Sequence, residues 1–362
     1  MNFTDYLTQK LPAVEAEIMR GLPAAPAAPA APAAPVASSA TSSPATASSE
    51  RTRADLNTYL YQPLAHFSAG GGKRVRPVLC CLGAEAVGGS TEAALPVACA
   101  IEDFQSAALI HDDIADKSEL RRGEKCLYKT LGTGLAINVG DSALVNVVRR
   151  VTVADHLSDQ LKVRVIDSLL AMQEHTLEGQ ALDLGWAQNE RWDVTSEQYL
   201  FMALSKTAYY SAAYPLVLGA LIGGADQKTL DALKEFGLKV GLAFQLQDDL
   251  LNLVGNAEVQ GKDFRSDITE GKRTLAVVYA LEHLGAAEKT ELVSILSAHT
   301  SDTLKLQRAV ELMESANAIK FVRTHALALV DEAKHVLENV ILTEDARDTL
   351  LSMADFFVNR ER

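Results

Sequence analysis

The sequence predicts an all-α fold, a bundle of long antiparallel helices around a deep central cavity. From residue 50 onward, apolar residues recur with the 3.6-residue period of a helix, and no sustained alternation indicates a sheet. Glycine-containing breaks then divide the chain into segments of about 15–30 residues, which are long for globular helices. These breaks lie at residues 70–72, 88–89, 132–134, 223–224 and 255–261.

Three segments are expected along the chain. Residues 1–22 are predicted to form a short amphipathic helix, because apolar side chains recur in them at helical spacing. Residues 23–49 are dominated by Ala, Pro, Ser and Thr, a composition that predicts an extended, disordered linker. Residues 50–362 are expected to form the functional domain. In that domain Pro77, just after the glycines, suits the first turn of a helix.

Composition excludes some classes of function. The chain has 362 residues, of which 48% are hydrophobic, so a large core is available. A formal net charge of −13 argues against a nucleic-acid partner, which requires a basic surface. No signal peptide and no membrane-spanning stretch is expected. The cysteines lack metal-ligand spacing and are expected to be reduced thiols of a cytoplasmic protein, namely Cys80, Cys81, Cys99 and Cys126.

The first acidic cluster lies in the segment HDDIAD and comprises Asp112, Asp113 and Asp116. Residues four apart share one helix face, so the first and last of these carboxylates project together. The preceding residues are apolar, which places three repelling charges beside a core. A divalent cation would neutralise them, and Mg²⁺ prefers such oxygen ligands. A solvated helix end is the alternative interpretation of this cluster.

The second acidic cluster lies in the segment QDDLLN and comprises Asp248, Asp249 and Asn252. Its last member is an amide, which can coordinate a cation through its carbonyl oxygen but brings no charge. Alone, this pair of aspartates would indicate a capping or surface feature. Two such clusters, each within an apolar helix, favour a shared metal and phosphate site.

Basic residues accompany both clusters. GGGKRVRP at residues 70–77 joins a glycine loop to a helix start, where backbone N–H groups, Lys73 and Arg76 form an anion site. The spacing differs from that of a nucleotide P-loop, and an ordinary charged loop is the alternative. Arg121 and Arg122 follow the first cluster, and Lys262 and Lys272 follow the second. Together these features predict a pocket that binds a polyanion through Mg²⁺ at its mouth and an apolar chain inside.

In this order and spacing, the motifs resemble those of the trans-isoprenyl diphosphate synthases, which make farnesyl, geranylgeranyl and longer polyprenyl diphosphates. The resemblance extends from about Tyr59 to the C-terminus. The motifs that carry it are GGKRVRP, Gln105, HDDIAD, RRG, GQALD, KT, FQLQDD, GKDFRSD and EGKRT. The resemblance implies the isoprenoid synthase fold, a homodimer, and condensation of isopentenyl diphosphate with an allylic diphosphate.

The resemblance also implies a role for each matching residue. The set implied for isopentenyl diphosphate is Lys73, Arg76, Gln105 and Arg122. The set implied for the allylic diphosphate is Arg121, Lys206, Thr207, Gln245, Lys262 and Lys272. About three Mg²⁺ ions per site, shared with the diphosphate, are implied for Asp112, Asp113, Asp116, Asp248, Asp249 and Asn252. Direct participation in the reaction is implied for the first cluster, Lys206 and Asp248.

Two features of the sequence bear on metal binding and on the length of the product. Many relatives carry Asp at the position of Asn252, so the second cluster here has one charge fewer. The side chains four and five residues before Asp112 are expected to point one turn deeper into the cavity. They are Ala108 and Ala107, with Phe104 about one turn further. These small residues predict a product longer than farnesyl diphosphate, with geranylgeranyl diphosphate expected first. The alternative is that the two alanines only allow close helix packing.

Three other functions are compatible with parts of the sequence. A terpene cyclase on the same fold does not need an isopentenyl diphosphate set, so Lys73, Arg76 and Arg122 argue against it. A non-catalytic partner subunit of a heteromeric synthase would lose metal-binding aspartates, and this chain keeps five of six. A helical scaffold with scattered charges does not account for so many ordered motifs.

Overall fold

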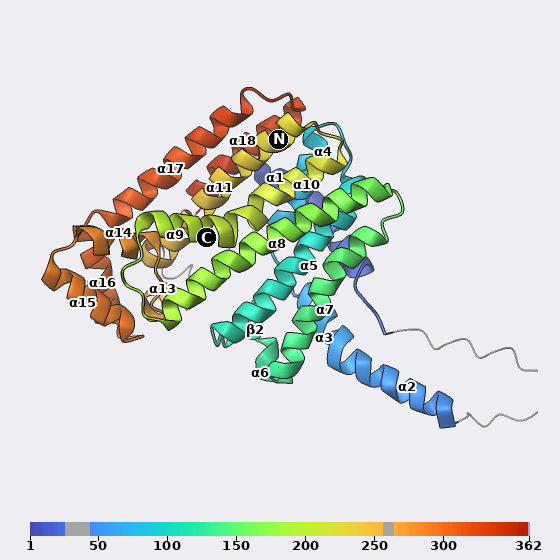
Figure 1. Ribbon diagram of the computed structural model, residues 1–362, viewed down its shortest axis with the longest axis horizontal. Helices are drawn as coiled ribbons and strands as arrows, with labels where there is room; N and C mark the ends of the chain where they lie inside the picture. Colours follow the sequence, from blue (N-terminus) through green and yellow to red (C-terminus); the bar gives the residue numbers. More distant parts are fainter. Residues whose placement is uncertain (26–43, 256–263, 361–362) are drawn as a thin grey trace, which may run out of the picture. The chain divides into compact units, whose positions relative to one another are not determined.

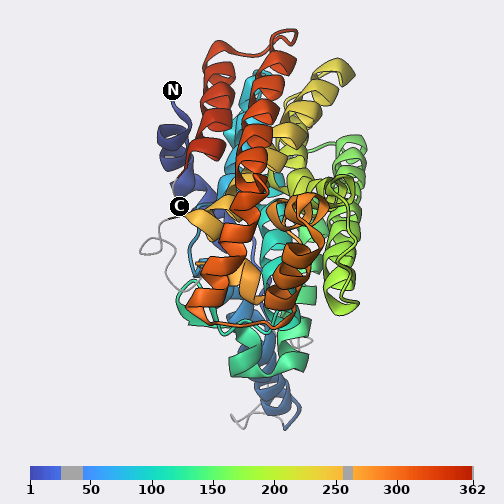
Figure 2. The same cartoon turned by 90° about the vertical axis from the view of Figure 1, so that its left-hand side faces the viewer.

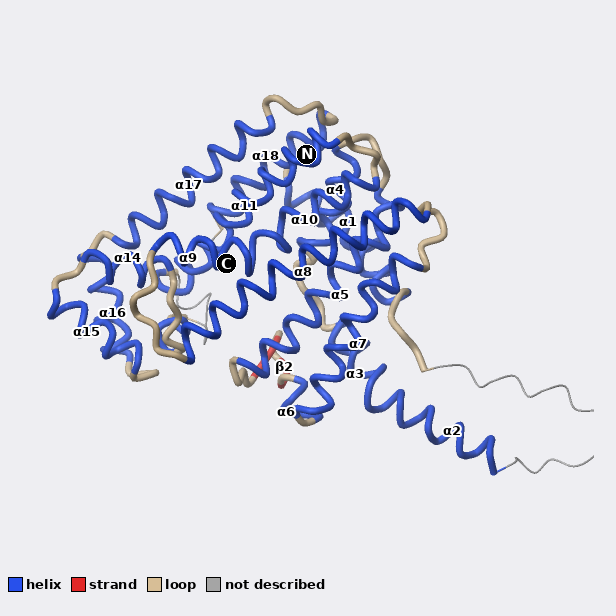
Figure 3. The backbone as a smooth tube through the Cα atoms, viewed as in Figure 1, coloured by secondary structure: helices blue, strands red, loops and turns tan. Residues whose placement is uncertain are grey.

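The computed structural model describes residues 1–25, 44–255 and 264–360, with side chains from residue 49 onward in the second range. Nearly all of this backbone is helical, with one short two-stranded element (Figure 3). The described chain divides into two compact units. Unit 1 comprises Met1–Gln9, Val78–Ala94 and Val163–Arg362, and unit 2 comprises Lys10–Pro77 and Leu95–Lys162.

Unit 2 is built around one apolar cluster between three helices. Leu64 and Phe67 come from one helix, Ala107 and Ile110 from a second, and Ala136, Val139 and Ala143 from a third. The elements with most or all of their residues in this unit are α1 (Phe3–Arg20), α2 (Pro44–Leu56), the π-helix η1 (Asn57–Tyr61), α3 (Gln62–Ala69), α5 (Thr91–Ala115), β1 (Leu120–Arg121), β2 (Glu124–Lys125), α6 (Leu127–Leu131) and α7 (Thr133–Thr152).

Unit 1 contains the longer series of helices. The elements with most or all of their residues in this unit are α4 (Val75–Ala86), α8 (Asp159–Gln188), α9 (Ser196–Ala203), the π-helix η2 (Leu204–Ala213), α10 (Tyr214–Ile222), α11 (Gln227–Val254), α13 (Ser266–Thr269), α14 (Leu275–His283), α15 (Ala286–Ser297), α16 (Thr303–Ser315), α17 (Ala318–Leu337) and α18 (Glu344–Asn359). Helices α11 and α17 pack side by side along their lengths (Figures 1 and 2).

Helix α11 is the central element of unit 1. The Asp226 side chain caps its first turn by accepting from the N–H of Thr229, and the helix stops at Gly255. Its buried side chains recur every three or four residues, which directs one face to the core. A Cβ atom added to Gly237 would lie 2.4 Å from the Ala213 Cα, so the missing side chain lets η2 pack directly on α11.

The glycine breaks expected from the sequence coincide with helix boundaries. Helix α3 ends at Ala69, α4 at Ala86, α10 at Ile222 and α11 at Val254, while α7 begins just after Gly132. The all-α prediction is therefore confirmed. The hairpin of β1 and β2 is the one strand pair in the described residues, and it is too short to alter the class.

The expected linker at residues 23–49 differs from the structure at its end. Helix α2 begins at Pro44, five residues before the predicted boundary is reached. Proline at the first helical position loses no hydrogen bond, and the alanines after it favour a helix. Residues 26–43 lie outside the described chain. The three-segment division remains a prediction, because the two compact units follow different boundaries.

One helix does meet the length and composition of a membrane span, contrary to the expectation from the sequence. This helix is α5, and 72% of its most apolar 18-residue window is buried inside the protein. Burial of this extent is typical of the core helix of a soluble protein, which passes the same test.

Candidate active site

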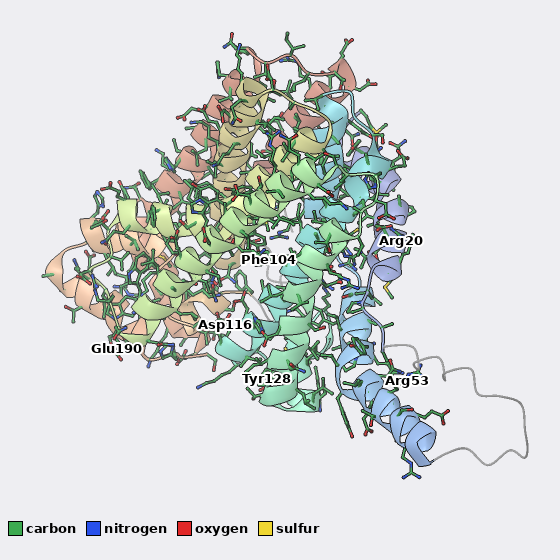
Figure 4. All side chains as sticks on the ribbon, turned by 45° about the vertical axis from the view of Figure 1, so that its right-hand side comes forward. Arg20, Arg53, Phe104, Asp116, Tyr128 and Glu190 are labelled. Atoms are coloured by element: carbon green, nitrogen blue, oxygen red, sulfur yellow. The ribbon has the colours of Figure 1, made fainter. Side chains whose placement is uncertain are left out.

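Helix α5 ends at Ala115, within the first acidic cluster, and Asp116 is the next residue (labelled in Figure 4). The N–H of Asp116 donates to the Asp112 carbonyl at 2.8 Å, so the last turn stays helical. Lys117 then adopts a left-handed conformation with φ 54°, and the Ser118 N–H bonds back to the Asp113 carbonyl at 3.0 Å. This pattern closes a helix and satisfies its last carbonyls. It fixes the three carboxylates within one turn.

A tight hairpin returns the chain to these carboxylates. Its turn residues, Arg122 and Gly123, have φ values of 53° and 86°, and a two-residue turn with both φ positive matches the twist of paired strands. The hairpin brings the Arg121 guanidinium onto Asp113, whose Oδ1 accepts from Nε at 2.9 Å and from Nη2 at 2.5 Å. An arginine implied for the allylic diphosphate thus contacts the first acidic cluster.

The first acidic cluster fits a magnesium ion that shares its coordination with a substrate. Asp113 is buried, and its Oδ2 has no hydrogen-bond partner among the described residues, which leaves one acceptor available. Among the described residues, no three Asp, Glu, His or Cys side chains already enclose a metal position. Magnesium commonly takes one or two carboxylates, several waters and substrate phosphates, so a preformed cage is not required.

Arg122 lies against the glycine loop of residues 70–72. Its Nη1 donates to the Phe67 carbonyl at 3.4 Å, and its guanidinium lies over the Phe67 ring at 5.7 Å. A Cβ atom on Gly72 would come within 3.2 Å of Arg122 Nη2, so glycine permits this approach. Burial, and then the charge of Arg74, lower the pKa of Arg122. An anion placed here would relieve the crowding of positive charge.

The other residues implied for isopentenyl diphosphate also belong to unit 2. Lys73 is exposed and Arg76 half-buried, both beside the loop that Arg122 contacts. Gln105 is buried, and its Oε1 has no hydrogen-bond partner in the part of the chain that the structure describes. A pocket of about 180 Å³ opens next to Arg122, and Arg121 and Lys125 are among its lining residues. The structure does not place Lys73, Arg76 or Gln105 in the lining of that pocket.

Unit 1 gathers the remaining residues around one pocket of about 140 Å³. Most of the implied allylic set and the whole second acidic cluster lie in its lining, namely Lys206, Thr207, Gln245, Asp248, Asp249, Asn252 and Lys272. The pocket is lined by α8, α9, η2, α11 and the segment from α13 to α14. Lys262 lies outside the described residues, so its implied role remains a prediction.

The wide turns of η2 position Lys206 and Thr207. A π-helix turn is rare and often marks a functional site, because it shifts side chains away from the regular register. Lys206 Nζ donates to Asp183 Oδ2 at 2.5 Å. The Thr207 hydroxyl donates to Gln245 Oε1 at 2.9 Å, and Gln245 Nε2 donates to Asp249 Oδ1 at 2.8 Å.

The two aspartates of the second acidic cluster have different environments. Asp249 is 7% exposed, and its Oδ2 also accepts a short hydrogen bond from the Tyr199 hydroxyl at 2.5 Å. The Asp248 side chain is 56% exposed. Burial and the neighbouring Asp267 carboxylate raise the pKa of Asp249, and burial raises that of Asp267 as well. A cation in this pocket would relieve the repulsion, so the donor set fits magnesium.

The carboxamide of Asn252 makes two hydrogen bonds to the chain around the start of α13. Its Nδ2 donates to the Ser266 hydroxyl at 3.0 Å, and its Oδ1 accepts from the Asp267 N–H at 3.2 Å. The side chain thus links α11 to the start of α13. Coordination of a metal through Oδ1 would compete with the second of these bonds. Asn252 as a ligand remains a prediction.

The three residues expected to set product length lie on α5, where Figure 4 labels Phe104. Phe104 is 4% exposed and Ala107 is fully buried. Ala107 belongs to the apolar cluster of unit 2, whereas Ala108 is half-buried and outside that cluster. These positions favour close helix packing as the role of Ala107, and they leave Ala108 as the better candidate for lining a cavity.

Four titratable residues in the lining of the unit 1 pocket were not predicted from the sequence: Asp183, Tyr199, Asp267 and Arg273. Three of them stand within recognised motifs, GQALD, GKDFRSD and EGKRT, so the sequence did carry a signal for them. Tyr199 lies in no motif. Only the fold brings its hydroxyl onto Asp249, 50 residues further along the chain.

Comparison with known proteins agrees with these observations. The family model for polyprenyl synthetase matches residues 57–313. A short chain isoprenyl diphosphate synthase of Methanothermobacter thermautotrophicus is 41% identical over 321 residues, covering 87% of this chain and 95% of the relative. A geranylgeranyl pyrophosphate synthase of Geoglobus acetivorans is 34% identical over 305 residues, covering 83% and 91%.

Solved structures give the same result. The geranylgeranyl pyrophosphate synthetase of Pyrococcus horikoshii superposes with a TM-score of 0.83 at 28% identity, covering 99% of both chains. A geranylgeranyl pyrophosphate synthase of Corynebacterium glutamicum, solved with isoprenyl diphosphate and magnesium, has a TM-score of 0.82 at 26% identity and covers 99% of this chain and all of that one. On the family model and the curated relatives together, the chain belongs to the polyprenyl synthetase family.

Proposed function

We propose that this protein is a trans-prenyltransferase that condenses isopentenyl diphosphate with an allylic diphosphate and releases geranylgeranyl diphosphate. The observation that carries the proposal is the unit 1 pocket, whose lining includes the cations of Lys206 and Lys272 and the carboxylates of Asp248 and Asp249. Cations and carboxylates in one pocket are what a diphosphate bound through magnesium requires. Relatives named geranylgeranyl synthases support the product.

Each substrate has its own set of residues in this proposal. Lys206, Thr207 and Lys272 hold the diphosphate of the allylic substrate in the unit 1 pocket. Lys73, Arg76 and Arg122 hold that of isopentenyl diphosphate in unit 2. Magnesium, when bound, neutralises the charge that develops on the departing diphosphate. About three ions are expected, and the complex of a relative with isoprenyl diphosphate and magnesium supports the ion type.

The chemistry balances without a protein nucleophile. The allylic C–O bond breaks, and its electron pair leaves with the diphosphate. The double bond of isopentenyl diphosphate then attacks the allylic carbon, a new C–C bond forms, and the proton lost from the adjacent carbon passes to the released diphosphate. The Thr207 hydroxyl and the Gln245 carboxamide, which bond to each other, supply dipoles near the developing cation. Holding both substrates in place does much of the remaining work.

A direct assay tests the proposal. The purified full chain is incubated with isopentenyl diphosphate, Mg²⁺ and dimethylallyl, geranyl or farnesyl diphosphate in turn, and the products are identified by mass. We expect geranylgeranyl diphosphate. Products longer than that would correct the chain length alone, whereas no condensation with any starter would refute the proposal. Cyclised hydrocarbons would identify a terpene cyclase instead.

We also infer that two copies of the chain associate, in the cytoplasm. Along α8, the apolar side chains of Val163, Leu170 and Leu177 recur every seven residues and are 67%, 48% and 65% exposed. Heptad spacing is typical of a helix that packs against another helix. Leu170→Glu is expected to give a monomer in light scattering, with the exposed Leu304→Glu as the control. A monomeric wild-type protein would contradict this inference.

A further inference from the structure

The side chain of Arg74 is buried although it lies in a loop between two basic residues. Lys73 before it is exposed and Arg76 after it is half-buried, whereas the Arg74 side chain is 0% exposed. The residue adopts a left-handed conformation with φ 46°, which is unfavourable for any residue with a Cβ atom. Such a conformation persists only when the surrounding contacts enforce it.

Three groups enforce it. Arg74 Nε donates to Glu15 Oε1 at 2.7 Å, and Nη2 reaches Glu15 Oε2 at 3.4 Å. Nη1 donates to Glu102 Oε1 at 2.6 Å, and Nη2 also donates to the Ser68 carbonyl at 2.5 Å. The guanidinium therefore joins α1, α5 and the end of α3, all within unit 2. Paired, charge-assisted bonds of this kind fix both position and orientation.

We propose that Arg74 is a positioning residue for the isopentenyl diphosphate set, and that Glu15 makes the second half of α1 part of that half-site. The proposal rests on the proposed function. Three consecutive glycines leave the loop before Lys73 few constraints of its own. Arg74 anchors this loop. Its position therefore determines the direction of the Lys73 side chain and the start of the helix that carries Arg76.

Glu15, the partner of Arg74 on α1, lies in a helix whose end is held by further hydrogen bonds. The Arg150 guanidinium, which is paired with Asp103, donates to the carbonyls of Glu17 and Ile18 at the end of that helix. Asn146 Nδ2 donates to the Gly21 carbonyl at 3.1 Å. These bonds satisfy carbonyls that a helix end leaves open. Glu15 is therefore presented from a helix that cannot easily follow a displaced loop.

Arg74 does not contact substrate in this proposal. Its charge is balanced by Glu15 and Glu102, so it adds little attraction for a diphosphate. These bonds from Arg74 to Glu15, Glu102 and the Ser68 carbonyl form a clamp. Its loss should displace Lys73 and Arg76 and so weaken the binding of isopentenyl diphosphate, but not that of the allylic diphosphate. A purely structural ion pair would lower thermal stability and affect both substrates equally. The ratio of the two KM values separates these cases.

The test uses Glu15→Gln, with Glu17→Gln as its matched control on the same helix. Glu15 is 34% exposed, so the change to an isosteric amide should leave the fold intact. Glu17 pairs with Arg20, which Figure 4 labels and whose side chain is 72% exposed, and neither residue is among the partners of Arg74 named above. We expect Glu15→Gln to raise the KM for isopentenyl diphosphate about tenfold, and that for the allylic diphosphate less than about twofold. Glu17→Gln should change neither.

An unchanged KM for isopentenyl diphosphate in Glu15→Gln would overturn the proposal, and so would an equal rise in both KM values. Arg74→Lys provides a second variant, because one ammonium cannot reproduce the fork that holds both carboxylates. It should show the same selective rise. Calorimetric titration with isopentenyl diphosphate gives a readout without turnover. If the wild-type protein made no product, the proposed function would fail, and this titration would still decide on the clamp.

Discussion

Arg360 Nη2 donates to Asp248 Oδ1 at 2.8 Å, so an arginine occupies the exposed carboxylate of the second acidic cluster. The arginine is well anchored: its guanidinium lies over the Phe244 ring at 4.0 Å and its side chain is 7% exposed. Gln247 Nε2 also donates to the Arg360 carbonyl at 3.0 Å. A metal ion that uses Asp248 must therefore compete with this guanidinium.

Arg360→Ala should consequently strengthen metal binding. Removing a partly exposed pair of this kind is worth about 1 kcal/mol, so the Mg²⁺ concentration for half-maximal rate should fall about fivefold. The measurement is a Mg²⁺ titration at saturating substrates, with Mn²⁺ binding by electron paramagnetic resonance as a readout without turnover. Arg323→Ala, on the exposed face of α17, is the charge-matched control. A higher metal requirement in Arg360→Ala would show that the arginine supports the site.

The two adjacent aspartates of the first acidic cluster should respond differently to the same substitution. Asp112→Asn and Asp113→Asn should each lower kcat at least about a hundredfold, because both remove a proposed metal ligand. Only Asp113→Asn leaves the Arg121 guanidinium, which is 32% exposed, without its charged partner. That variant should also lose about 1–2 kcal/mol of stability. Thermal denaturation compares the two, and equal melting temperatures would contradict the structural role of the pair.

Local signals in the sequence were sufficient for the helices but not for the contacts between them. Apolar periodicity and glycine breaks predicted where α3, α4, α10 and α11 end, because those signals act within one turn of the chain. The motifs also predicted seven lining residues of the unit 1 pocket. Tyr199 and Arg360 could not be found in this way. Each reaches an aspartate of the second acidic cluster from a distant segment, and no local pattern encodes such a contact.

The alanines before the first acidic cluster show the same limit. Helical spacing placed Ala107 and Ala108 about one turn before Asp112. Spacing alone does not tell which of two adjacent residues faces a neighbouring helix. The structure packs Ala107 into the apolar cluster with Leu64 and Val139, and leaves Ala108 half-buried outside it. The two positions are therefore not equivalent, although helical spacing alone does not distinguish them.

This difference gives a prediction for product length. Ala108→Phe should shorten the main product, because an aromatic ring would block a growing chain. Ala107→Phe should instead overpack unit 2 and lower stability by about 1–3 kcal/mol. Product chain length by mass spectrometry and melting temperature are measured for both variants. A shortened product from Ala107→Phe, with unchanged stability, would show instead that residue 107 lines the cavity and limits product length.

Gly179 positions Lys206 by having no side chain. A Cβ atom added to this glycine of α8 would lie 2.2 Å from the Lys206 backbone nitrogen and 2.6 Å from its Cα, distances that real atoms do not adopt. The backbone of η2 must therefore move in Gly179→Ala, and Lys206 moves with it. We expect the KM for the allylic diphosphate to rise at least about tenfold, and stability to fall by about 1–3 kcal/mol.

Gly185→Ala, six residues further along α8, is the matched control. Apart from its chain neighbours and the nearby backbone of its own helix, no atom of the described residues lies within 4 Å of its added Cβ, and alanine favours a helix over glycine. Stability should therefore rise by about 0.5–1 kcal/mol with unchanged KM values. Because both changes add one methyl group to one helix, only the contact with Lys206 distinguishes them. If Gly179→Ala kept the wild-type KM for the allylic diphosphate despite lower stability, Lys206 would not depend on this packing for its position.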